Sequence, residues 1–133
     1  HFSLDPMAQI VEALRADAVA RELPIIVFTK GGGQWLPRIS EIGCDALGCD
    51  WTTSLREARR LMQDRVALQG NLDPAVLNAS PEKIRSAVRD VLEDYGTGPG
   101  HVFNLGHGIT PGIDPENVKV LVDSVHELSR TPI

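Results

Sequence analysis

The chain has 133 residues, of which 42% are hydrophobic and 23% charged, and its formal net charge is −5. These ordinary values exclude a disordered, collagenous or coiled-coil chain and fit one domain with its own core. No block of basic residues indicates a nucleic-acid surface, and no apolar stretch approaches the roughly 20 residues that cross a bilayer. We therefore expect a partner that is neither nucleic acid nor membrane.

The first predicted element is a helix over residues 7–20, whose apolar residues recur at helical spacing. Its apolar stripe comprises Ile10, Val11, Leu14 and Ala18. A short β-prone run, PIIVFTK at residues 24–30, predicts a strand. A second helical pattern follows at 33–43, with Pro37 in its first turn and Gly43 as its C-terminal stop.

Residues 45–50 (DALGCD) and 66–71 (VALQGN) predict two further strands. We expect all four strands, including those at 24–30 and 101–106, to be buried on both faces, because their apolar runs are brief. Between them, residues 54–64 predict a helix, because Ser54 followed by Glu57 three residues later is a capping box. The two cysteines lie at opposite ends of the run ALG (46–48), too far apart for a disulfide if that run is a strand, so we expect free, buried thiols in a reducing cytosol. They are Cys44 and Cys49.

The last predicted helices share one type of start. Ser80 is the expected cap of residues 80–96 and Asp114 that of residues 114–130, each followed by proline as the first helical residue. Between these helices, residues 101–106 (HVFNLG) predict a fourth strand. The residues expected on the buried faces of the two helices are Ile84, Val88, Leu92, Val118, Leu121, Val122, Val125 and Leu128.

One helix followed by four strand–helix units predicts an α/β fold with a parallel sheet and right-handed crossovers. Closing a (β/α)8 barrel takes eight strands and about 250 residues, so four units form either an open sheet or half a barrel. We treat residues 1–133 as a single domain. The beginning HFSLDPMAQ has no signal-peptide pattern. It also lacks an initiator methionine, which fits either a piece of a longer chain or a processed terminus.

Function in such folds gathers where the parallel strands end. The residues expected there are Lys30, Gly31, Gly32, Gly33, Asp50, Trp51, Asn71, Asp73, Asn104, Gly106, His107 and Gly108. The glycine run lacks the spacing of a Walker or dinucleotide loop, so it either faces an anion with free amides or simply permits a tight turn. Asp73 precedes a proline and is expected to cap a helix. For Asp50 two interpretations stay open, a helix cap and an acidic residue of the site.

His107 is the main candidate for chemistry. It lies between two glycines just after the last strand, where an imidazole can donate a hydrogen bond to a carboxylate or transfer a proton near neutral pH. A loop histidine without function is the alternative. The cysteine spacing fits no familiar zinc pattern and no histidine lies nearby, so no metal site is expected.

Four blocks in order resemble the C-terminal part of bacterial uroporphyrinogen decarboxylases. They are FTKGGGQWL (28–36), GCDALGCDWT (43–52), VALQGNLDP (66–74) and VFNLGHGITPGIDPENVKVLVDSVHELS (102–129). The resemblance implies the last four units of a (β/α)8 TIM-type barrel, in a cytoplasmic homodimer. It implies a cofactor-free carboxy-lyase that converts the acetate side chains of the tetrapyrrole uroporphyrinogen stepwise to methyl groups, giving coproporphyrinogen in haem biosynthesis.

The histidine of the family's GHG block, which contacts substrate, maps onto His107 as the expected catalytic and substrate-binding residue. Further expected substrate contacts are Lys30, Asn71, Asn104, Gly106 and Gly108. The family's arginine cluster, central aspartate and tyrosine have no counterparts here and would lie upstream of His1. We therefore expect the 133-residue piece alone to be inactive.

One alternative lies within the same superfamily and another is a non-catalytic binding domain. A zinc-dependent corrinoid or thiol methyltransferase of the same superfamily would have a cysteine ligand where this chain has His107. A small flavodoxin-like domain would hold a phosphorylated ligand over Gly31–Gly33 in a complete, monomeric fold. An interaction module without a site is a third possibility, for which the sequence offers no exposed motif.

Overall fold

The computed structural model describes residues 3–130, which contain four parallel strands in one sheet. In chain order the strands are β1 (Ile26–Phe28), β2 (Ala46–Gly48), β3 (Ala67–Leu72) and β4 (His101–Leu105). Neighbours in the sheet are also neighbours in the chain. The register aligns one residue from each strand across the sheet, namely Phe28, Gly48, Gln69 and Val102.

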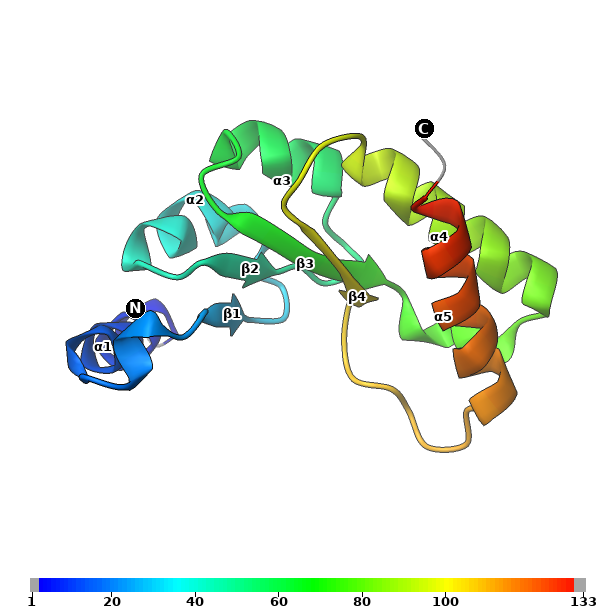
Figure 1. Cartoon of the computed structure of the whole chain (residues 1–133), viewed down its shortest axis with the longest axis horizontal. Helices are drawn as coiled ribbons and strands as arrows, with labels where there is room; N and C mark the ends of the chain where they lie inside the picture. Colours follow the sequence, from blue (N-terminus) through cyan, green and yellow to red (C-terminus); the bar gives the residue numbers. More distant parts are fainter. Residues whose placement is uncertain (1–2, 131–133) are drawn as a thin grey trace.

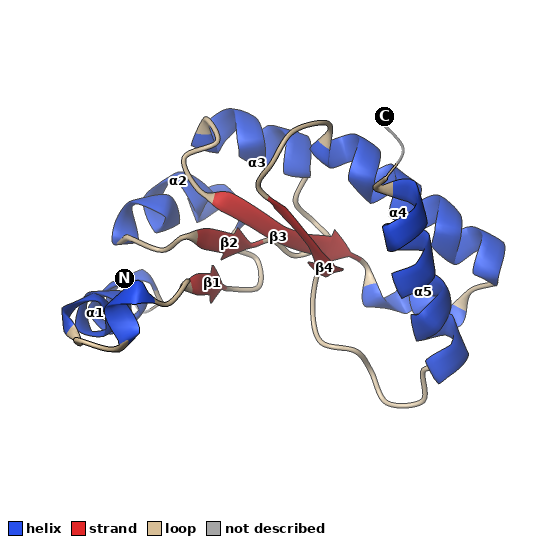
Figure 2. Cartoon of the chain, viewed as in Figure 1, coloured by secondary structure: helices blue, strands red, loops and turns tan. Residues whose placement is uncertain are grey.

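Helices connect the strands and lie in an arc along one side of the sheet (Figures 1 and 2). They are α1 (Leu4–Ala16), α2 (Leu36–Ile39), α3 (Leu55–Met62), α4 (Pro81–Tyr95) and α5 (Pro115–Leu128). Short 3-10 turns are η1 (Ala20–Glu22), η2 (Gly33–Trp35), η3 (Ser40–Ile42) and η4 (Pro74–Asn78). The predicted helix followed by four parallel strand–helix units is confirmed.

The strand order distinguishes the two architectures that the sequence left open, an open α/β sheet and half a barrel. A flavodoxin-like sheet places its second strand outside the first, in the order 2-1-3-4-5. The sequential order β1-β2-β3-β4 is instead that of consecutive units of a (β/α)8 barrel. The flavodoxin-like alternative is therefore wrong.

The polar residues that begin the helices act largely as predicted. The Ser54 hydroxyl accepts a hydrogen bond from the Glu57 amide at 3.3 Å, and the Asp114 carboxylate accepts one from the Glu116 amide at 2.9 Å. Asp73 caps η4 in the same way, through the Ala75 amide. Ser80 precedes α4 at the N-cap position, but its side chain makes no capping hydrogen bond. Gly43 ends η3 at φ 89°, as its predicted role as a stop requires.

The core lies between the sheet and the helices. Val27, Leu47 and Leu68 point from successive strands into a cluster that includes Leu55 and Met62 of α3. A second cluster joins α4 to α5 around Ile84, Val88, Leu92 and Leu121. These contacts fix the helical side of the sheet, and residues alternating with the core residues point to the opposite side, here called the inner face.

The prediction that the strands are buried on both faces is wrong for the two edge strands, β1 and β4. On the inner face Ile26, Phe28 and Val102 are 44–47% exposed, because no element within residues 3–130 covers them. Among the helix predictions, Val122 is also exposed. Of the predicted stripe of residues 7–20 only Val11 is buried, whereas Ile10, Leu14 and Ala18 are exposed. Within residues 3–130 no helix has the length and hydropathy that crossing a membrane requires.

Candidate functional site

All four strands end at the same edge of the sheet, because they are parallel. Four loops follow these strand ends and together form what we call the rim: residues 29–33 after β1, 49–54 after β2, 73–74 after β3 and 106–109 after β4. The side chains predicted to carry function therefore gather at one end of the molecule.

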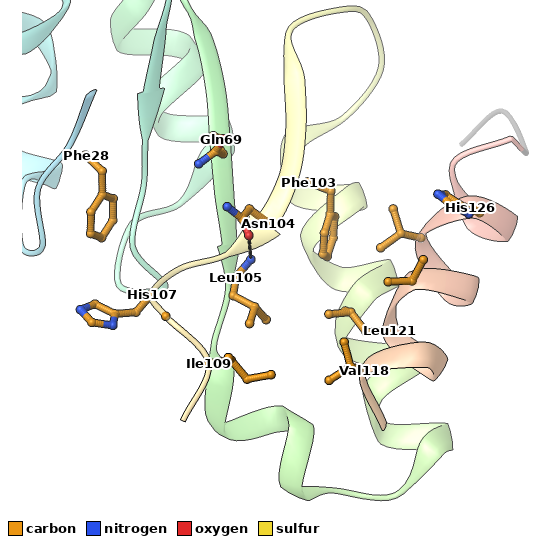
Figure 3. Close-up of a pocket in the computed structure, with 13 residues that line it drawn as sticks. Phe28, Gln69, Phe103, Asn104, Leu105, His107, Ile109, Val118, Leu121 and His126 are labelled. Atoms are coloured by element: carbon orange, nitrogen blue, oxygen red, sulfur yellow. Dashed lines mark hydrogen bonds between the residues drawn. The ribbon is translucent and has the colours of Figure 1, made fainter. Parts of the chain in front are cut away.

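His107 lies at this rim with an exposed imidazole. Its ring meets the Phe28 ring edge-on, with 6.1 Å between the ring centroids, and the Trp51 ring similarly, at 6.3 Å. Figure 3 shows His107 near Phe28, across β4 from the side chains of α5. Two aromatic rings from β1 and from the loop after β2 thus flank the imidazole of the loop after β4.

Lys30 reaches the same aromatic ring. Its ammonium nitrogen lies 5.2 Å from the centroid of the Trp51 ring, within the range of a cation–π contact. Trp51 therefore touches both the His107 imidazole and the Lys30 ammonium, two groups that can donate a hydrogen bond to a carboxylate. Sequence reasoning placed Trp51 at a strand end without giving it a role, and only its position directly after Asp50 pointed to it.

Asp50 is buried beside the rim, with 2% of its surface exposed. One carboxylate oxygen accepts hydrogen bonds from the Thr52 amide at 2.9 Å and the Thr52 hydroxyl, and the other accepts one from the Gly31 amide. Burial acts to raise the pKa of Asp50, but these hydrogen bonds and the charge of Lys30 outweigh it, so the pKa lies below its ordinary value. Asp50 is therefore an ionised residue that joins two loops, and Ser54 caps α3 instead.

The glycine run after β1 adopts a tight turn. Gly31 has φ +72°, which favours glycine, and its amide donates to Asp50. The Gly32 amide donates to the Thr29 carbonyl, and the helix that follows has only four residues. Since the Gly31 and Gly32 amides are already used within the protein, the turn interpretation is favoured over an anion site.

Asn71 and Asn104 occupy different environments. Asn71 is buried, and its amide nitrogen donates to the carbonyls of Asp50 and Thr53. Asn104 is exposed on the inner face, where its side-chain oxygen accepts a hydrogen bond from the Leu105 amide (Figure 3). Asn104 is therefore accessible on the inner face, whereas Asn71 holds the loop after β2.

The two glycines beside His107 also differ. A side chain at Gly106 would come within 2.5 Å of the Trp51 amide nitrogen, whereas one at Gly108 would meet no atom within 4 Å. Gly106 therefore permits a close approach of two backbones, and Gly108 lies free in the loop.

The sulfur and acidic groups do not form a metal site in the part of the chain described. No three His, Cys, Asp or Glu side chains gather within residues 3–130. Cys44 and Cys49 are free and buried, as predicted. Burial raises the pKa of the Cys49 thiol to about 12, so this cysteine stays protonated near neutral pH.

Comparison with known proteins decides the family. The model of the uroporphyrinogen decarboxylase (URO-D) family matches residues 1–128. The chain belongs to the uroporphyrinogen decarboxylase family. A uroporphyrinogen decarboxylase from Thioalkalivibrio sulfidiphilus is 62% identical over 126 residues, which cover 95% of the chain and 36% of that protein. Another, from Alkalilimnicola ehrlichii, is 60% identical over 128 residues, which cover 96% of the chain and 35% of that protein.

The chain thus spans about a third of the length of these uroporphyrinogen decarboxylases. Among solved structures, a methyltransferase from Methanosarcina mazei superposes on 96% of the chain and 38% of its own length, with a TM-score of 0.74 and 23% identity. At that identity the likeness concerns the fold alone. It supports the parallel strand–helix arrangement of this uroporphyrinogen decarboxylase family member.

Proposed function

We propose that the chain is the C-terminal part of a uroporphyrinogen decarboxylase and that residues 1–133 form the last four units of its barrel. The observation that carries this proposal is the family match over residues 1–128, combined with the exposed His107 at the strand-end rim. The exposed inner-face residues Ile26, Phe28 and Val102 support the incomplete barrel, since the preceding units of a closed barrel would cover them.

The groups at the rim support the proposed substrate. Uroporphyrinogen carries eight carboxylates, and such a ligand requires hydrogen-bond donors with positive charge. Lys30 offers a positively charged donor and the His107 imidazole a further donor, and the rings of Phe28 and Trp51 offer apolar surface for pyrrole rings. We place His107 as the catalytic and substrate-binding residue, with further contacts from Lys30, Asn104 and the backbone of the His107 loop.

The reaction removes an acetate carboxylate as CO2 and leaves a methyl group. When the carbon–carbon bond breaks, its electron pair passes into a pyrrole ring that has been protonated beforehand. A proton then adds to the side-chain carbon, and the ring loses the proton that it took up first, which restores the pyrrole. Electrostatic stabilisation of the charged ring is the main demand on the enzyme. In this scheme the substrate supplies the electron sink, and His107 holds a side-chain carboxylate or delivers a proton.

The proposal extends to the intact protein. We propose a cytoplasmic homodimer that makes coproporphyrinogen for haem biosynthesis without a cofactor, as the family resemblance implies. An arginine cluster and a central aspartate from the preceding units would complete the site. The 133-residue piece alone is therefore expected to be inactive, and coproporphyrinogen formed by the purified piece would contradict this.

The decisive experiment uses the full-length enzyme and the variant His107→Asn, with His126→Asn as the control. Both histidines are exposed, but His126 lies on α5 away from the rim. We expect conversion of uroporphyrinogen to coproporphyrinogen to slow at least about tenfold in His107→Asn and to stay unchanged in His126→Asn. A wild-type protein that yields no coproporphyrinogen would refute the activity, and an unchanged His107→Asn rate would remove that residue from the mechanism.

A further inference from the structure

We propose that Asp50 is a positioning residue that holds the His107 loop in place through the Asp50–Trp51 peptide. This inference rests on the proposed function, because it assigns Asp50 a task in the same site. Asp50 is not expected to touch the substrate, since only 2% of its surface is exposed.

The Asp50 carboxylate joins two rim loops. It accepts the Gly31 amide, 19 residues earlier in the chain, and the amide and hydroxyl of Thr52 in its own loop. These bonds fix both sides of the residue, so the peptide between Asp50 and Trp51 has little freedom to rotate. The same carboxylate therefore sets the position of Lys30, which precedes Gly31, and of Trp51.

The Asp50–Trp51 peptide in turn supports the loop after β4. Gly106 lies so close to it that an added side chain would come within 2.5 Å of the Trp51 nitrogen and 3.0 Å of the Asp50 carbonyl carbon. The Asn71 amide nitrogen donates to the Asp50 carbonyl oxygen at 2.9 Å and so holds the same peptide from β3. A shift of this peptide would therefore move the residue directly before His107.

The Trp51 side chain provides a second connection. Its ring contacts the His107 imidazole and the Lys30 ammonium. If Asp50 no longer holds the loop after β2, the Trp51 ring can shift, and its contacts with His107 and Lys30 are then lost. Because a displacement of about 1 Å in a reacting group can reduce a rate by about 100-fold, such a release would be visible in catalysis.

Asparagine is the sharpest replacement, because Asp50→Asn keeps the size of the side chain. The two carboxylate oxygens of Asp50 face donors only: the Gly31 amide on one side and the Thr52 amide and hydroxyl on the other. In Asp50→Asn an amide NH2 group must oppose one of these donor sets. Asp73→Asn is the matched control, because Asp73 accepts the Ala75 amide two residues later and bonds to no other rim loop.

The first test is a double-mutant cycle for coproporphyrinogen formation in the full-length enzyme. We expect Asp50→Asn to reduce kcat at least about tenfold in the wild-type background but less than about twofold in the His107→Asn background. Asp73→Asn should leave kcat unchanged in both backgrounds. Equal losses from Asp50→Asn in the two backgrounds would show that Asp50 acts independently of His107 and would overturn the proposal.

The second test does not depend on activity. In full-length protein with 13C-labelled histidine, the His107 ring resonance, assigned by its loss in His107→Asn, reports the ring currents of Trp51 and Phe28. We expect the chemical shift of this resonance to change in Asp50→Asn and to stay the same in Asp73→Asn. An unmoved resonance would refute the positioning role, even in a protein whose decarboxylase activity is normal. If the wild type lacks activity but the resonance moves as expected, the proposed function fails while the positioning role stands.

Discussion

The guanidinium of Arg59 lies over the ring of Tyr95, with 4.3 Å between its central carbon and the centroid of the ring. One of its nitrogens also donates to the carbonyls of Tyr95 and Thr97, each at 2.9 Å, and its Nε donates to Asp64 at 2.9 Å. Arg59 thereby joins α3 to the end of α4 and to the loop that leads into β4. This contact lies at the opposite end of the strands from the rim.

The first prediction concerns this contact. Arg59→Lys keeps the charge but loses the planar group that stacks and donates in several directions, so the full-length protein should lose about 1–2 kcal/mol of stability. Arg60→Lys is the control, because Arg60 is exposed and pairs with Glu57 on the same helix. Thermal unfolding should show a lower midpoint for Arg59→Lys alone. Equal midpoints in the two variants would contradict the assigned role.

The second prediction concerns the close approach of Gly106 to the Trp51 amide. Gly106→Ala places a methyl group against backbone atoms that cannot rotate away, so we expect a loss of about 1–3 kcal/mol of stability. Gly108→Ala, two residues later, meets open space and should unfold at the wild-type temperature. Calorimetry of the two full-length variants compares them directly. A lower unfolding temperature for Gly108→Ala than for Gly106→Ala would contradict this assignment of the close approach.

The third prediction concerns pH. Burial lowers the pKa of His101, and the nearby charge of Arg59 acts in the same direction, although the hydrogen bond to the Gly70 carbonyl opposes them. The folded protein thus favours the neutral ring, while an unfolded histidine has a pKa of about 6.5. The stability that this neutral ring contributes is complete above about pH 6.5 and is lost as the pH falls from there through the lower pKa of the folded state.

Unfolding of full-length wild type and His101→Gln at a series of pH values measures this effect. The unfolding midpoint should fall more steeply in wild type than in His101→Gln as the solution is acidified below about pH 6.5. His126→Gln is the control, since His126 is exposed on α5, and its profile should follow that of wild type. Parallel profiles for wild type and His101→Gln would exclude His101 as a source of pH dependence.

The fourth prediction concerns thiol chemistry. Because burial raises the pKa of Cys49 to about 12 and also raises that of Cys44, neither should react with iodoacetamide in the native protein near neutral pH. Both should be alkylated after denaturation. Mass spectrometry of tryptic peptide 39–56, which contains both cysteines, reads the two states in one experiment. Modification of the native peptide at the rate of the denatured one would show that the thiols are accessible.

The elements, their order and the residues at the rim could be predicted from local patterns in the sequence. Strand runs such as 66–71 and cap residues such as Ser54 and Asp114 act over a few neighbouring residues, so a local pattern is sufficient to find them. The parallel sheet followed from the alternation of strands and helices, and parallel strands bring His107 and Lys30 to one edge.

The tertiary structure alone decided how the rim residues are connected and which faces stay exposed. The sequence could not distinguish Asp50 as a cap from Asp50 as an acidic site residue, because its partner Gly31 lies 19 residues away. The contact of Trp51 with His107 joins loops 56 positions apart by the numbering, and it exists only because β2, β3 and β4 are neighbours in the sheet. The exposure of Phe28 and Val102 likewise depends on which elements cover the inner face, which is a property of the assembled fold and not of a local pattern.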